Sequence, residues 1–395
     1  MKVLLLTTSF PLTKDSRSGV FILRLVENLP EDVRATVLTP DDCGTEKYAA
    51  SSRYELRPFR YAPKSWQRLA HGEGGITAAL GQSKLNLLLL PVLLSSCFIA
   101  TCWLARKSDI IHANWSINGV IAGITGLLLR KPVITTLRGS DVNLMAKSGL
   151  MRLLVRCCFH LSRQVVTVSP SLQQTLAARF PAFADKISVI ANGIAPAFFV
   201  ASDRRDYAAA PPRFLYAGNL LPGKGVQVIL EAAAVLAEKD WLLDIVGDGP
   251  EREKLEAFCQ AKGLSGKVRF HGAVAPEEMP DWMGQADIFV FASFAEGRPN
   301  VVLEAMAAGL PVLASSIPAV QDLITPGKEG LLFPPGDARQ LAAQMTQLLS
   351  RTAERRGMGE QARRTVAALG LSWEETGRRY ATLYKTALSS AAASR

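Results

Sequence analysis

Short apolar runs alternate with longer helix-like stretches along the whole chain. The runs are rich in Val, Ile and Leu, and most are followed by Gly, Ser, Pro or Asn. Continuous apolar runs are typical of strands buried on both faces of a parallel sheet, and their alternation with helices predicts a doubly wound α/β fold. The predicted strands are Val3–Thr8, Ala35–Thr39, Ile110–Ala113, Val133–Leu137, Val165–Ser169, Ile187–Ile190, Phe214–Gly218, Leu242–Gly247, Val268–Gly272, Ile288–Ser293, Val312–Ser315 and Leu331–Phe333.

One polar segment rich in alanine and proline, Ala201–Arg213, divides these runs into two sets and is the best candidate for a linker. A chain of 395 residues is too long for one core, because a domain typically holds ~150 residues. We therefore expect two Rossmann-like domains that face a cleft, over residues 1–200 and 201–371. A capping-box pattern from Ser372 to Glu375 predicts a further amphipathic helix over residues 372–391.

The net charge of +10 lies in the first half of the chain. Residues 1–199 hold 23 Lys and Arg against 12 Asp and Glu, a net charge of +11, whereas residues 200–395 hold 22 against 23. A basic half suits a nucleic acid, an acidic polymer or an anionic membrane leaflet, and a solubility charge without a partner is the alternative. We expect peripheral contact with an anionic membrane and no nucleic-acid binding.

The cysteines and the start of the chain favour a cytoplasmic protein. The six cysteines show no metal-type spacing, and the adjacent pair Cys157–Cys158 is poorly placed for a disulfide, so we expect reduced thiols. The opening residues MKVLLLTTSF lack the long apolar core and the cleavage site of a signal peptide, and they predict a buried strand instead.

The segment Leu85–Ala105 carries no charge and is long enough for a membrane span. A span would separate strands that should share one sheet, and Pro91 weakens it further. We expect a buried pair of helices, or an apolar face that rests in the membrane interface. The stretch Met151–Arg163, with basic residues every four positions, favours the interfacial alternative, although a solvated basic face over the core explains that helix equally well.

The most informative stretch is FAEGRPNVVLEAMAAGLPVLAS, Phe294–Ser315. A loop with Glu296 precedes Pro299 and Asn300, which suit the first turn of a helix over Val301–Ala308. Free amides at such a helix start form a seat for a diphosphate. Glu304 can accept hydrogen bonds from both ribose hydroxyls, and Glu296 can reach a second sugar. The alternative is that both glutamates are ordinary surface charges.

A second candidate element is FLYAGNLLPGKGVQVILEA, Phe214–Ala233, which has the order strand, glycine loop, helix. Gly218, Gly223 and Gly225 permit a close approach of the backbone, and Lys224 supplies a point charge for phosphate. A glycine-rich loop alone is weak evidence. Both elements follow the carboxyl ends of predicted strands, where open sheets bind their ligands, and together they predict a nucleotide site.

These two elements, with DIVGDGPEREKLE (Asp244–Glu256) and NGI (Asn192–Ile194), closely resemble glycosyltransferase family 4 over nearly the whole chain. In the first half the resemblance is carried by SFPLTKDSRSGVFILRLVENL, by DIIHANW (Asp109–Trp115) and by TLRGSDV (Thr136–Val142). It implies the two-domain GT-B fold, with a carboxy-terminal domain that holds a nucleotide sugar and an amino-terminal domain that receives the acceptor. It also implies that the terminal helix crosses back onto the first domain and that transfer retains the anomeric configuration.

The resemblance implies roles for individual residues. Glu304 would bind the ribose, Glu296 the donor hexose and Lys224 the diphosphate, while the backbone at Val274 would contact the base. Gly19 would approach the phosphate or the acceptor. The full set of implied donor-site residues is Gly218, Asn219, Lys224, Val274, Glu296, Gly297, Arg298, Pro299, Asn300, Val301 and Glu304.

Two positions depart from the family pattern. Asn219 stands where the family often has an arginine after the first loop glycine, and Arg298 is a candidate replacement for the missing charge. Arg138 stands where the family often has a histidine before Gly-Ser-Asp. The candidate catalytic residues are therefore Glu296, Lys224, His112 and Arg138, and the candidate acceptor or phosphate-loop residues are Gly19, Arg138 and Asp141. For His112, a purely structural role is the alternative.

The sequence predicts a retaining hexosyltransferase that uses a UDP- or GDP-sugar and a glycan or lipid-linked acceptor in cell-surface polysaccharide synthesis. We expect it at the inner face of the plasma membrane. No aspartate-rich pair lies near the phosphate site, so we expect neither a metal nor another cofactor. The alternatives are a sugar-nucleotide epimerase of the same fold, which needs no acceptor, and a membrane-associated scaffold without turnover, which Asn219 and Arg138 suggest.

Overall fold

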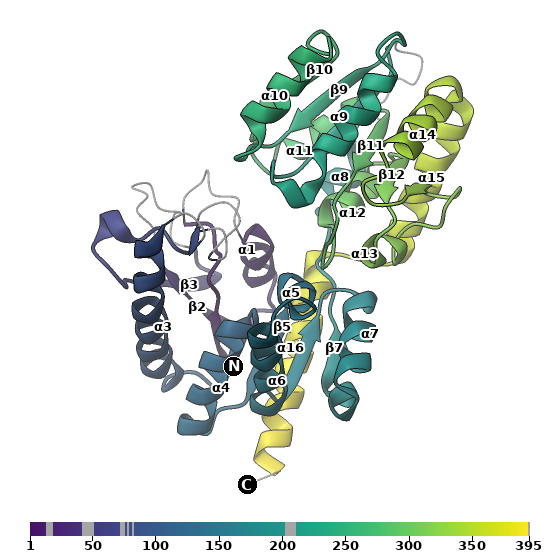
Figure 1. Ribbon diagram of the computed structural model, residues 1–395. Helices are drawn as coiled ribbons and strands as arrows, with labels where there is room; N and C mark the ends of the chain where they lie inside the picture. The colour runs from purple at the N-terminus through teal and green to yellow at the C-terminus, as the bar shows by residue number, and fades with distance from the viewer. Residues whose placement is uncertain are drawn as a thin grey trace. The chain divides into compact units, whose positions relative to one another are not determined.

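The computed structural model describes residues 1–12, 19–41, 51–71, 76, 79–80, 83–201 and 211–393. The chain forms two compact units, Met1–Gly193 with Trp373–Arg395, and Ile194–Ser372 (Figure 1). Each unit is a parallel sheet with helices on both faces, which confirms the predicted doubly wound α/β class.

The sheet of the first unit has seven strands in the order β3-β2-β1-β4-β5-β6-β7. Residues along one strand alternate between two cores, so that Val3 and Leu5 of β1 face one layer of helices and Leu4 and Leu6 face the other. This two-sided burial is the reason for the continuous apolar runs. The strands are β1 (Lys2–Leu6), β2 (Arg34–Pro40), β3 (Tyr54–Phe59), β4 (Ile110–Asn114), β5 (Val133–Leu137), β6 (Gln164–Thr167) and β7 (Ile187–Val189).

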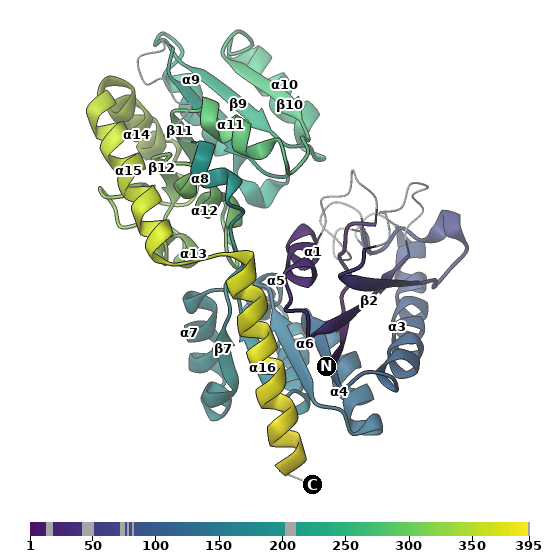
Figure 2. The ribbon, with the colours of Figure 1, turned by 180° about the vertical axis from the view of Figure 1, so that it is seen from behind.

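Two layers of helices cover this sheet. The helices α1 (Val20–Glu27) and α16 (Trp373–Ala393) share one core with the sheet, and Figure 2 shows α16 along that face. The opposite face carries α3 (Lys84–Ala105), α4 (Ser116–Leu129), α5 (Ser140–Met145), α6 (Gly149–Leu161) and α7 (Pro170–Arg179). Short 3₁₀ turns occur at Lys64–Trp66 and Pro181–Lys186.

The second unit contains a six-stranded sheet in the order β10-β9-β8-β11-β12-β13. On β8, Phe214 and Tyr216 face one core while Leu215 and Ala217 face the other. The strands are β8 (Arg213–Ala217), β9 (Leu242–Val246), β10 (Val268–Gly272), β11 (Ile288–Phe291), β12 (Val312–Ser315) and β13 (Gly330–Phe333).

Helices cover both faces of the second sheet as well. One face packs against α9 (Val226–Val235), α10 (Arg252–Ala261) and α14 (Ala338–Ser350). The other packs against α8 (Ala197–Ala201), α11 (Met279–Gln285), α12 (Asn300–Ala307), α13 (Pro318–Gln321) and α15 (Thr352–Ala368). A 3₁₀ turn, η4 (Pro222–Lys224), precedes α9.

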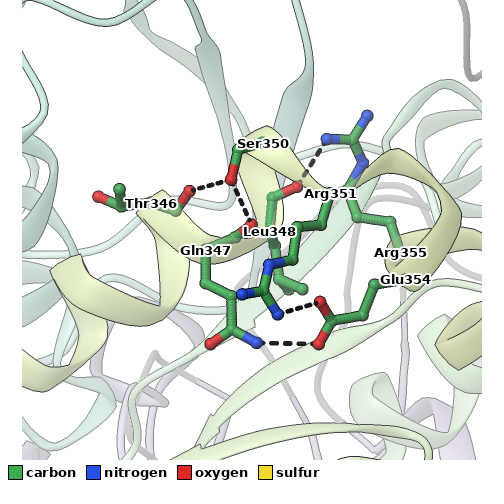
Figure 3. Close-up of polar contacts among 7 residues, drawn as sticks. All are labelled: Thr346, Gln347, Leu348, Ser350, Arg351, Glu354 and Arg355. Atoms are coloured by element: carbon green, nitrogen blue, oxygen red, sulfur yellow. Dashed lines mark hydrogen bonds and ion pairs between the residues drawn. The ribbon is translucent and has the colours of Figure 1, made fainter.

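Side chains close the carbonyl end of α14 where it meets α15 (Figure 3). The buried guanidinium of Arg355 donates through Nη1 to the carbonyl oxygens of Leu348 at 2.7 Å and Leu349 at 3.0 Å. Glu354 accepts from Gln347 of α14 at 2.8 Å and from Arg351 at 3.1 Å. The last carbonyls of a helix lack partners within the helix, so these bonds satisfy the end of α14 and fix the start of α15.

The twelve predicted strands are all present, with ends that differ from the predicted ones by at most two residues. The edge strand β3 was missed, because its exposed and half-buried residues alternate and it holds Pro58, a pattern without a continuous apolar run. The predicted linker falls largely on residues outside the described ranges.

The structure corrects two further expectations. The segment predicted as a buried pair of helices is the single helix α3, in which Pro91 lies inside the helix and large apolar side chains such as Leu88 and Trp103 are exposed. Residues 194–200 lie in the second unit rather than the first, because Phe198 packs in the second core and the Ile194 amide donates to Leu371. The helix α3 is long and apolar enough to cross a membrane, but 22% of it is buried against the unit, and β3 and β4 on either side of it belong to one sheet.

Candidate functional site

Three loops of the second unit are joined by their backbones where β8, β9 and β11 end. The Gly218 amide donates to Val246 at 3.0 Å, and the Leu220 amide donates to Asp248 at 2.8 Å. The Phe294 amide donates to Gly223 at 3.0 Å. These bonds hold the loops after the three strands in one fixed arrangement at the carboxyl edge of the sheet, where open α/β sheets bind ligands.

Glycine is required at two of these positions by close packing. Gly225 lies at the start of α9 in the left-handed region, with φ of +68°, and a Cβ atom there would lie 2.2 Å from the Ala292 carbonyl oxygen. A Cβ atom on Gly247 would lie 1.9 Å from the Gly218 carbonyl oxygen. Both glycines let neighbouring loops approach more closely than any other residue allows.

Lys224 and Glu296 meet at this edge of the sheet. Lys224 ends the turn η4, and its Nζ donates to Glu296 Oε1 in the loop after β11 at 2.6 Å. The exposed fractions are 32% for the Lys224 side chain and 16% for the Glu296 side chain, so this ion pair is partly shielded from water. The contact fixes the ammonium group of Lys224 beside the loop that leads to α12. This charged group can donate hydrogen bonds to an anionic ligand.

Tyr216 supports the loop that follows β8. Its hydroxyl donates to the Asn219 carbonyl oxygen at 3.1 Å, and the ring is fully buried in the core. Burial raises the pKa of Tyr216, and the nearby charge of Glu296 raises it further, so the hydroxyl remains a donor. No sequence pattern marks Tyr216 as a site residue, since a tyrosine inside an apolar strand looks like any core residue.

The start of α12 offers fewer free amides than the sequence predicts. The Asn300 amide donates to Arg298 at 3.0 Å and the Val302 amide to Pro299 at 3.0 Å, so both are used in the turn. The Val301 amide donates to none of the residues that the structure describes. With the helix dipole behind it, Val301 provides the backbone donor for an anion here.

Glu304 lies one turn into α12 and is partly exposed. Burial raises the pKa of its carboxyl group to about 7. Across the described ranges, no side chain donates a hydrogen bond to this carboxyl group. Burial disfavours the ionised form of this carboxyl group. A ligand whose two hydroxyl groups donate hydrogen bonds to the carboxylate would stabilise that form.

Arg298 precedes α12, and its guanidinium is half-buried. Burial lowers the pKa of Arg298 to about 10, and the charge of Asp322 after α13 opposes this shift. Asp322 therefore stabilises the charged form of Arg298 within the second unit, less than burial disfavours it. The structure contains no contact of Arg298 with Lys224 or Asn219 among those it describes, so its expected compensation for Asn219 remains a prediction.

Val274 follows β10 and packs, half-buried, against the core that contains α12. Three residues before it, His271 Nε2 lies 2.7 Å from Asp244 Oδ1, and the His271 ring packs on Trp282 at 4.4 Å between ring centroids. This cluster fixes the chain that leads to Val274. No sequence pattern marks this cluster, because its members are far apart along the chain and the parallel register of β9 and β10 is what brings His271 close to Asp244.

In the first unit, the structure removes His112 from the candidate catalytic residues. Its side chain is fully buried, and both ring nitrogens have partners: Nδ1 lies 2.7 Å from the Tyr384 hydroxyl and Nε2 lies 2.8 Å from Thr136 Oγ1. Burial, together with the charge of Arg138, lowers the pKa of His112 to about 3. His112 therefore connects β4, β5 and α16, and it has neither a free nitrogen nor access to solvent.

Arg138 lies directly after β5 and is held on three sides. Its Nε and Nη2 donate to Asn114 Oδ1 at 3.0 and 2.8 Å, and Nη1 donates to Asn192 Oδ1 at 3.0 Å. The guanidinium also lies over the Phe21 ring, 4.5 Å from its centroid. The Asn114 and Asn192 side chains are neutral, so they fix the guanidinium of Arg138 without neutralising its positive charge. A half-buried cation is thus held at the carboxyl edge of the first sheet.

Beside Arg138, Trp115 adopts a backbone conformation that favours glycine, with φ of 68° and ψ of 155°. Such a conformation costs roughly 1–3 kcal/mol and often marks a functional site. The Trp115 amide donates to Thr136 at 2.9 Å, and the ring contacts Phe21 edge to face at 6.2 Å. No pattern in the sequence distinguishes this tryptophan from a core residue.

Asp141 and Gly19 have local structural roles. Asp141 Oδ1 accepts from the Ser116 amide at 3.0 Å and from the Ser116 hydroxyl at 2.7 Å, so the carboxyl group caps the start of α4. Burial raises the pKa of Asp141, and the bonds from Ser116 oppose that shift. Gly19 begins α1 with φ of +78°, and a Cβ atom there would lie 2.2 Å from the Ser9 carbonyl oxygen. Packing against Ser9 thus explains the glycine without a ligand.

Across the described parts of the chain, no group of three or more His, Cys, Asp or Glu side chains lies close enough together to hold a metal ion.

Two family profiles match the chain, one in each half. The profile described as "Glycosyltransferase Family 4" matches residues 18–198, and the profile "Glycosyl transferases group 1" matches residues 202–365. The amylovoran biosynthesis glycosyltransferase AmsK of Erwinia amylovora is 27% identical over 387 residues, covering 88% of this chain and 90% of that protein. The N-acetyl-alpha-D-glucosaminyl L-malate synthase of Bacillus anthracis is 27% identical over 286 residues, covering 70% and 74%.

Solved structures match nearly the whole chain. Sucrose-phosphate synthase from Thermosynechococcus elongatus superposes with a TM-score of 0.78 at 22% identity, covering 99% of this chain and 100% of that one. The Anabaena protein HepE, in complex with UDP-glucose, superposes with a TM-score of 0.73 at 20% identity, covering 98% and 100%. At these identities, the superpositions establish the likeness of the fold.

Proposed function

This chain belongs to glycosyltransferase family 4 and has the GT-B fold, and we propose that it transfers a hexose from a UDP- or GDP-sugar to a glycan or lipid-linked acceptor with retention of configuration. The observation that carries the proposal is the contact of Lys224 with Glu296 at 2.6 Å, beside the start of α12. The likeness to a biosynthetic relative such as AmsK supports a role in cell-surface polysaccharide synthesis.

The second unit holds the donor in this proposal. Lys224 and the Val301 amide bind the diphosphate, Glu304 accepts from the ribose hydroxyls, and Glu296 accepts from the hexose. The backbone after β10, at Val274, contacts the base. Each role follows from the chemistry of the group: a cation and an amide for phosphate, and two carboxylates for hydroxyls. The HepE complex supports UDP-glucose as one donor to test.

Transfer forms a bond between the acceptor oxygen and the anomeric carbon, and it breaks the bond from that carbon to the β-phosphate oxygen. The leaving diphosphate takes the proton of the acceptor hydroxyl from the same face, which retains the configuration. Lys224 and the α12 dipole stabilise the charge that develops on this phosphate by several kcal/mol. We propose that these donors replace a metal, so that chelation with EDTA leaves the rate unchanged. A loss of activity that Mg²⁺ or Mn²⁺ restores would overturn this part.

Arg138 is the candidate acceptor residue of the first unit. Asn114 and Asn192 fix its guanidinium, and Phe21 and Trp115 place two half-buried aromatic rings beside it. Aromatic rings stack on sugar faces, and a fixed guanidinium binds phosphate in two-point geometry. This combination favours a phosphate-bearing glycan acceptor, such as a lipid-linked sugar. The free thiols of the five described cysteines support a reducing, cytoplasmic setting for the reaction.

Lys224→Ala tests the donor site. We expect it to lower the rate of transfer at least tenfold, about 1.4 kcal/mol, because the β-phosphate loses its charged donor. Thermal stabilisation by a panel of nucleotide sugars first identifies the donor, and initial rates then compare the variants. Lys254→Ala is the matched control, because Lys254 of α10 is exposed and pairs with Glu251, the residue before that helix. Equal rates for Lys224→Ala and the control would overturn the site.

Arg138→Lys tests the acceptor site. A lysine keeps the charge but cannot bond Asn114 and Asn192 together, so we expect transfer to fall at least tenfold while the dissociation constant of the donor stays unchanged. Calorimetry with the donor and transfer to a panel of free and lipid-linked glycans separate the two effects. A weaker donor affinity with unchanged transfer would assign Arg138 to the donor instead.

A further inference from the structure

The helix α3 presents an apolar stripe to solvent. Leu88, Val92, Ile99 and Trp103 follow one another at helical spacing, and the exposed fractions are 72% for Leu88 and 57% for Trp103. The opposite side of the same helix, with Leu93 and other residues, is buried in the core of the first unit. Helices of soluble proteins normally place polar residues on the exposed side, so an exposed stripe of this kind indicates an interaction surface.

The helix α4 extends this surface. Its last two turns expose Ile124, Leu127 and Leu128. The helices α3 and α4 pack side by side, and the Cys102 thiol of α3 lies 3.5 Å from the Thr125 hydroxyl of α4. Both helices lie on one face of the sheet in Figure 1. We define the α3–α4 surface as the exposed residues Leu88, Val92, Ile99, Trp103, Ile124, Leu127 and Leu128.

Cations border the α3–α4 surface at one end. Arg106 and Lys107 follow α3, and Arg130 and Lys131 follow α4. Because α3 and α4 lead into the adjacent parallel strands β4 and β5, all four cations lie at the same edge of the first sheet. Lys107 Nζ lies over the Trp103 ring, 5.6 Å from its centroid.

Acidic residues are scarce in this part of the chain. Neither α3 nor α4 contains Asp or Glu, and between residues 84 and 131 only Asp109 is acidic. Asp109 Oδ2 already accepts a hydrogen bond from the Lys2 amide at 2.7 Å. The neighbouring helix α6 packs against α4 and adds exposed Arg152 and Arg156. The charge next to the α3–α4 surface is therefore strongly positive.

We propose that the α3–α4 surface docks the first unit onto an anionic lipid bilayer. The apolar side chains enter the interfacial layer, Trp103 lies at its boundary, and Arg106, Lys107, Arg130 and Lys131 contact the headgroups. A tryptophan beside lysine and arginine stems is typical of residues at this depth. The helix rests in the interface and does not cross it, because its other side is part of the core.

The positive charge beside the α3–α4 surface favours an anionic bilayer over a second copy of the chain as the partner of this surface. A two-fold dimer through the α3–α4 surface would bury the same cation-rich surface on both partners, with no acidic residue on α3 or α4 to pair with it. Anionic headgroups complement these cations. Each cation adds to the electrostatic attraction, and salt weakens that attraction. The proposal is independent of the proposed sugar transfer, since it concerns only the α3–α4 surface and the four cations.

Sedimentation with vesicles tests the proposal on the full chain. The two vesicles are pure phosphatidylcholine and a mixture with about one third phosphatidylglycerol, at about 0.1 M NaCl. We expect binding to the anionic vesicles at least tenfold tighter than to the neutral ones. The quadruple variant Arg106→Gln, Lys107→Gln, Arg130→Gln, Lys131→Gln should lose at least tenfold of that affinity.

Matched control variants come from the second unit. Lys262→Gln, Arg269→Gln, Lys328→Gln and Arg339→Gln remove four exposed cations there and should leave vesicle binding unchanged. For the apolar part, Ile99→Ser with Leu127→Ser should weaken binding at least tenfold, whereas Val235→Ser with Leu369→Ser, at exposed positions of the second unit, should not. Equal effects of the test and control variants would overturn the proposal.

Quenching of tryptophan fluorescence by brominated lipid gives a second measurement of membrane contact. It uses the unchanged chain, so no substitution can destabilise the fold. We expect brominated anionic vesicles to quench part of the tryptophan fluorescence, and Trp103→Phe to remove most of that quenching. Trp66→Phe, at another exposed tryptophan of the first unit, is the control. Light scattering without lipid tests the dimer. A stable dimer that Ile99→Ser with Leu127→Ser dissociates, together with no vesicle binding, would assign the surface to a second copy of the chain.

Discussion

At the scale of single residues, the environment decides what each candidate side chain can do. Lys224 and Glu296 form a partly shielded ion pair, whereas His112 is enclosed and neutral. A sequence shows the type of each residue but not its burial, and burial is what shifts a pKa or removes access. The identities of the candidate residues were therefore visible in advance, and the exclusion of His112 was not.

Glu304 leads to a prediction about pH. Its pKa is raised to about 7, and a ligand whose hydroxyls donate to the carboxylate binds the ionised form. Between pH 6 and pH 8 the ionised fraction rises about tenfold, so we expect donor affinity to rise by roughly the same factor. Calorimetry at both pH values measures this change. The Glu304→Gln variant supplies the control, because it cannot ionise and retains only the titration of the nucleotide itself. A variant with the same pH dependence as the wild type would rule out Glu304.

At the scale of elements, side chains from distant segments join strands and helices. His112 on β4 connects to Thr136 on β5 and to Tyr384 on α16, and Tyr380 of α16 lies 3.1 Å from the same Thr136 hydroxyl. The apolar runs predict the strands well, because burial on both faces leaves a strong signal. They do not predict the edge strand β3 or these cross-links, which depend on register between segments that are far apart in sequence.

This cross-link predicts an acid sensitivity of the first unit. The folded pKa of His112 is about 3, below its ordinary value of 6.5, so the unfolded chain takes up a proton first as the pH falls. The stability that neutral His112 gives is full above pH 6.5 and is lost towards pH 3, by about 2 kcal/mol between pH 7 and pH 5. Chemical denaturation at the two pH values tests this, with His112→Gln as the variant that cannot titrate. A loss of the same size in His112→Gln would contradict the assignment.

At the scale of the whole molecule, the chain crosses between its two units twice. The first unit ends at Gly193, the second ends at Ser372, and α16 then completes the core of the first unit. Tyr380 and Tyr384 are fully buried there. The amino-terminal half is consequently not a complete fold without the last residues of the chain.

Removal of α16 should therefore affect one unit and spare the other. A chain that ends at Ser372 loses two buried tyrosines, each of which contributes about 3–5 kcal/mol, and this approaches the whole stability of a domain. We expect the calorimetric transition of the first unit to disappear while that of the second unit and its nucleotide binding remain. A chain that ends at Leu388 keeps both tyrosines and serves as the control. Two unchanged transitions in the shorter chain would contradict the role of α16.

The sequence by itself determined the doubly wound class, the strands buried on both faces and the two glycine-rich and acidic elements of the second unit, because periodicity and turn residues are local signals. Only the tertiary structure decided which of these residues meet. It placed Lys224 on Glu296, held Arg138 between Asn114 and Asn192, and enclosed His112 beneath α16. It also left the apolar stripe of α3 exposed beside four cations. Contacts and burial arise from the packing of distant segments, which no local pattern records.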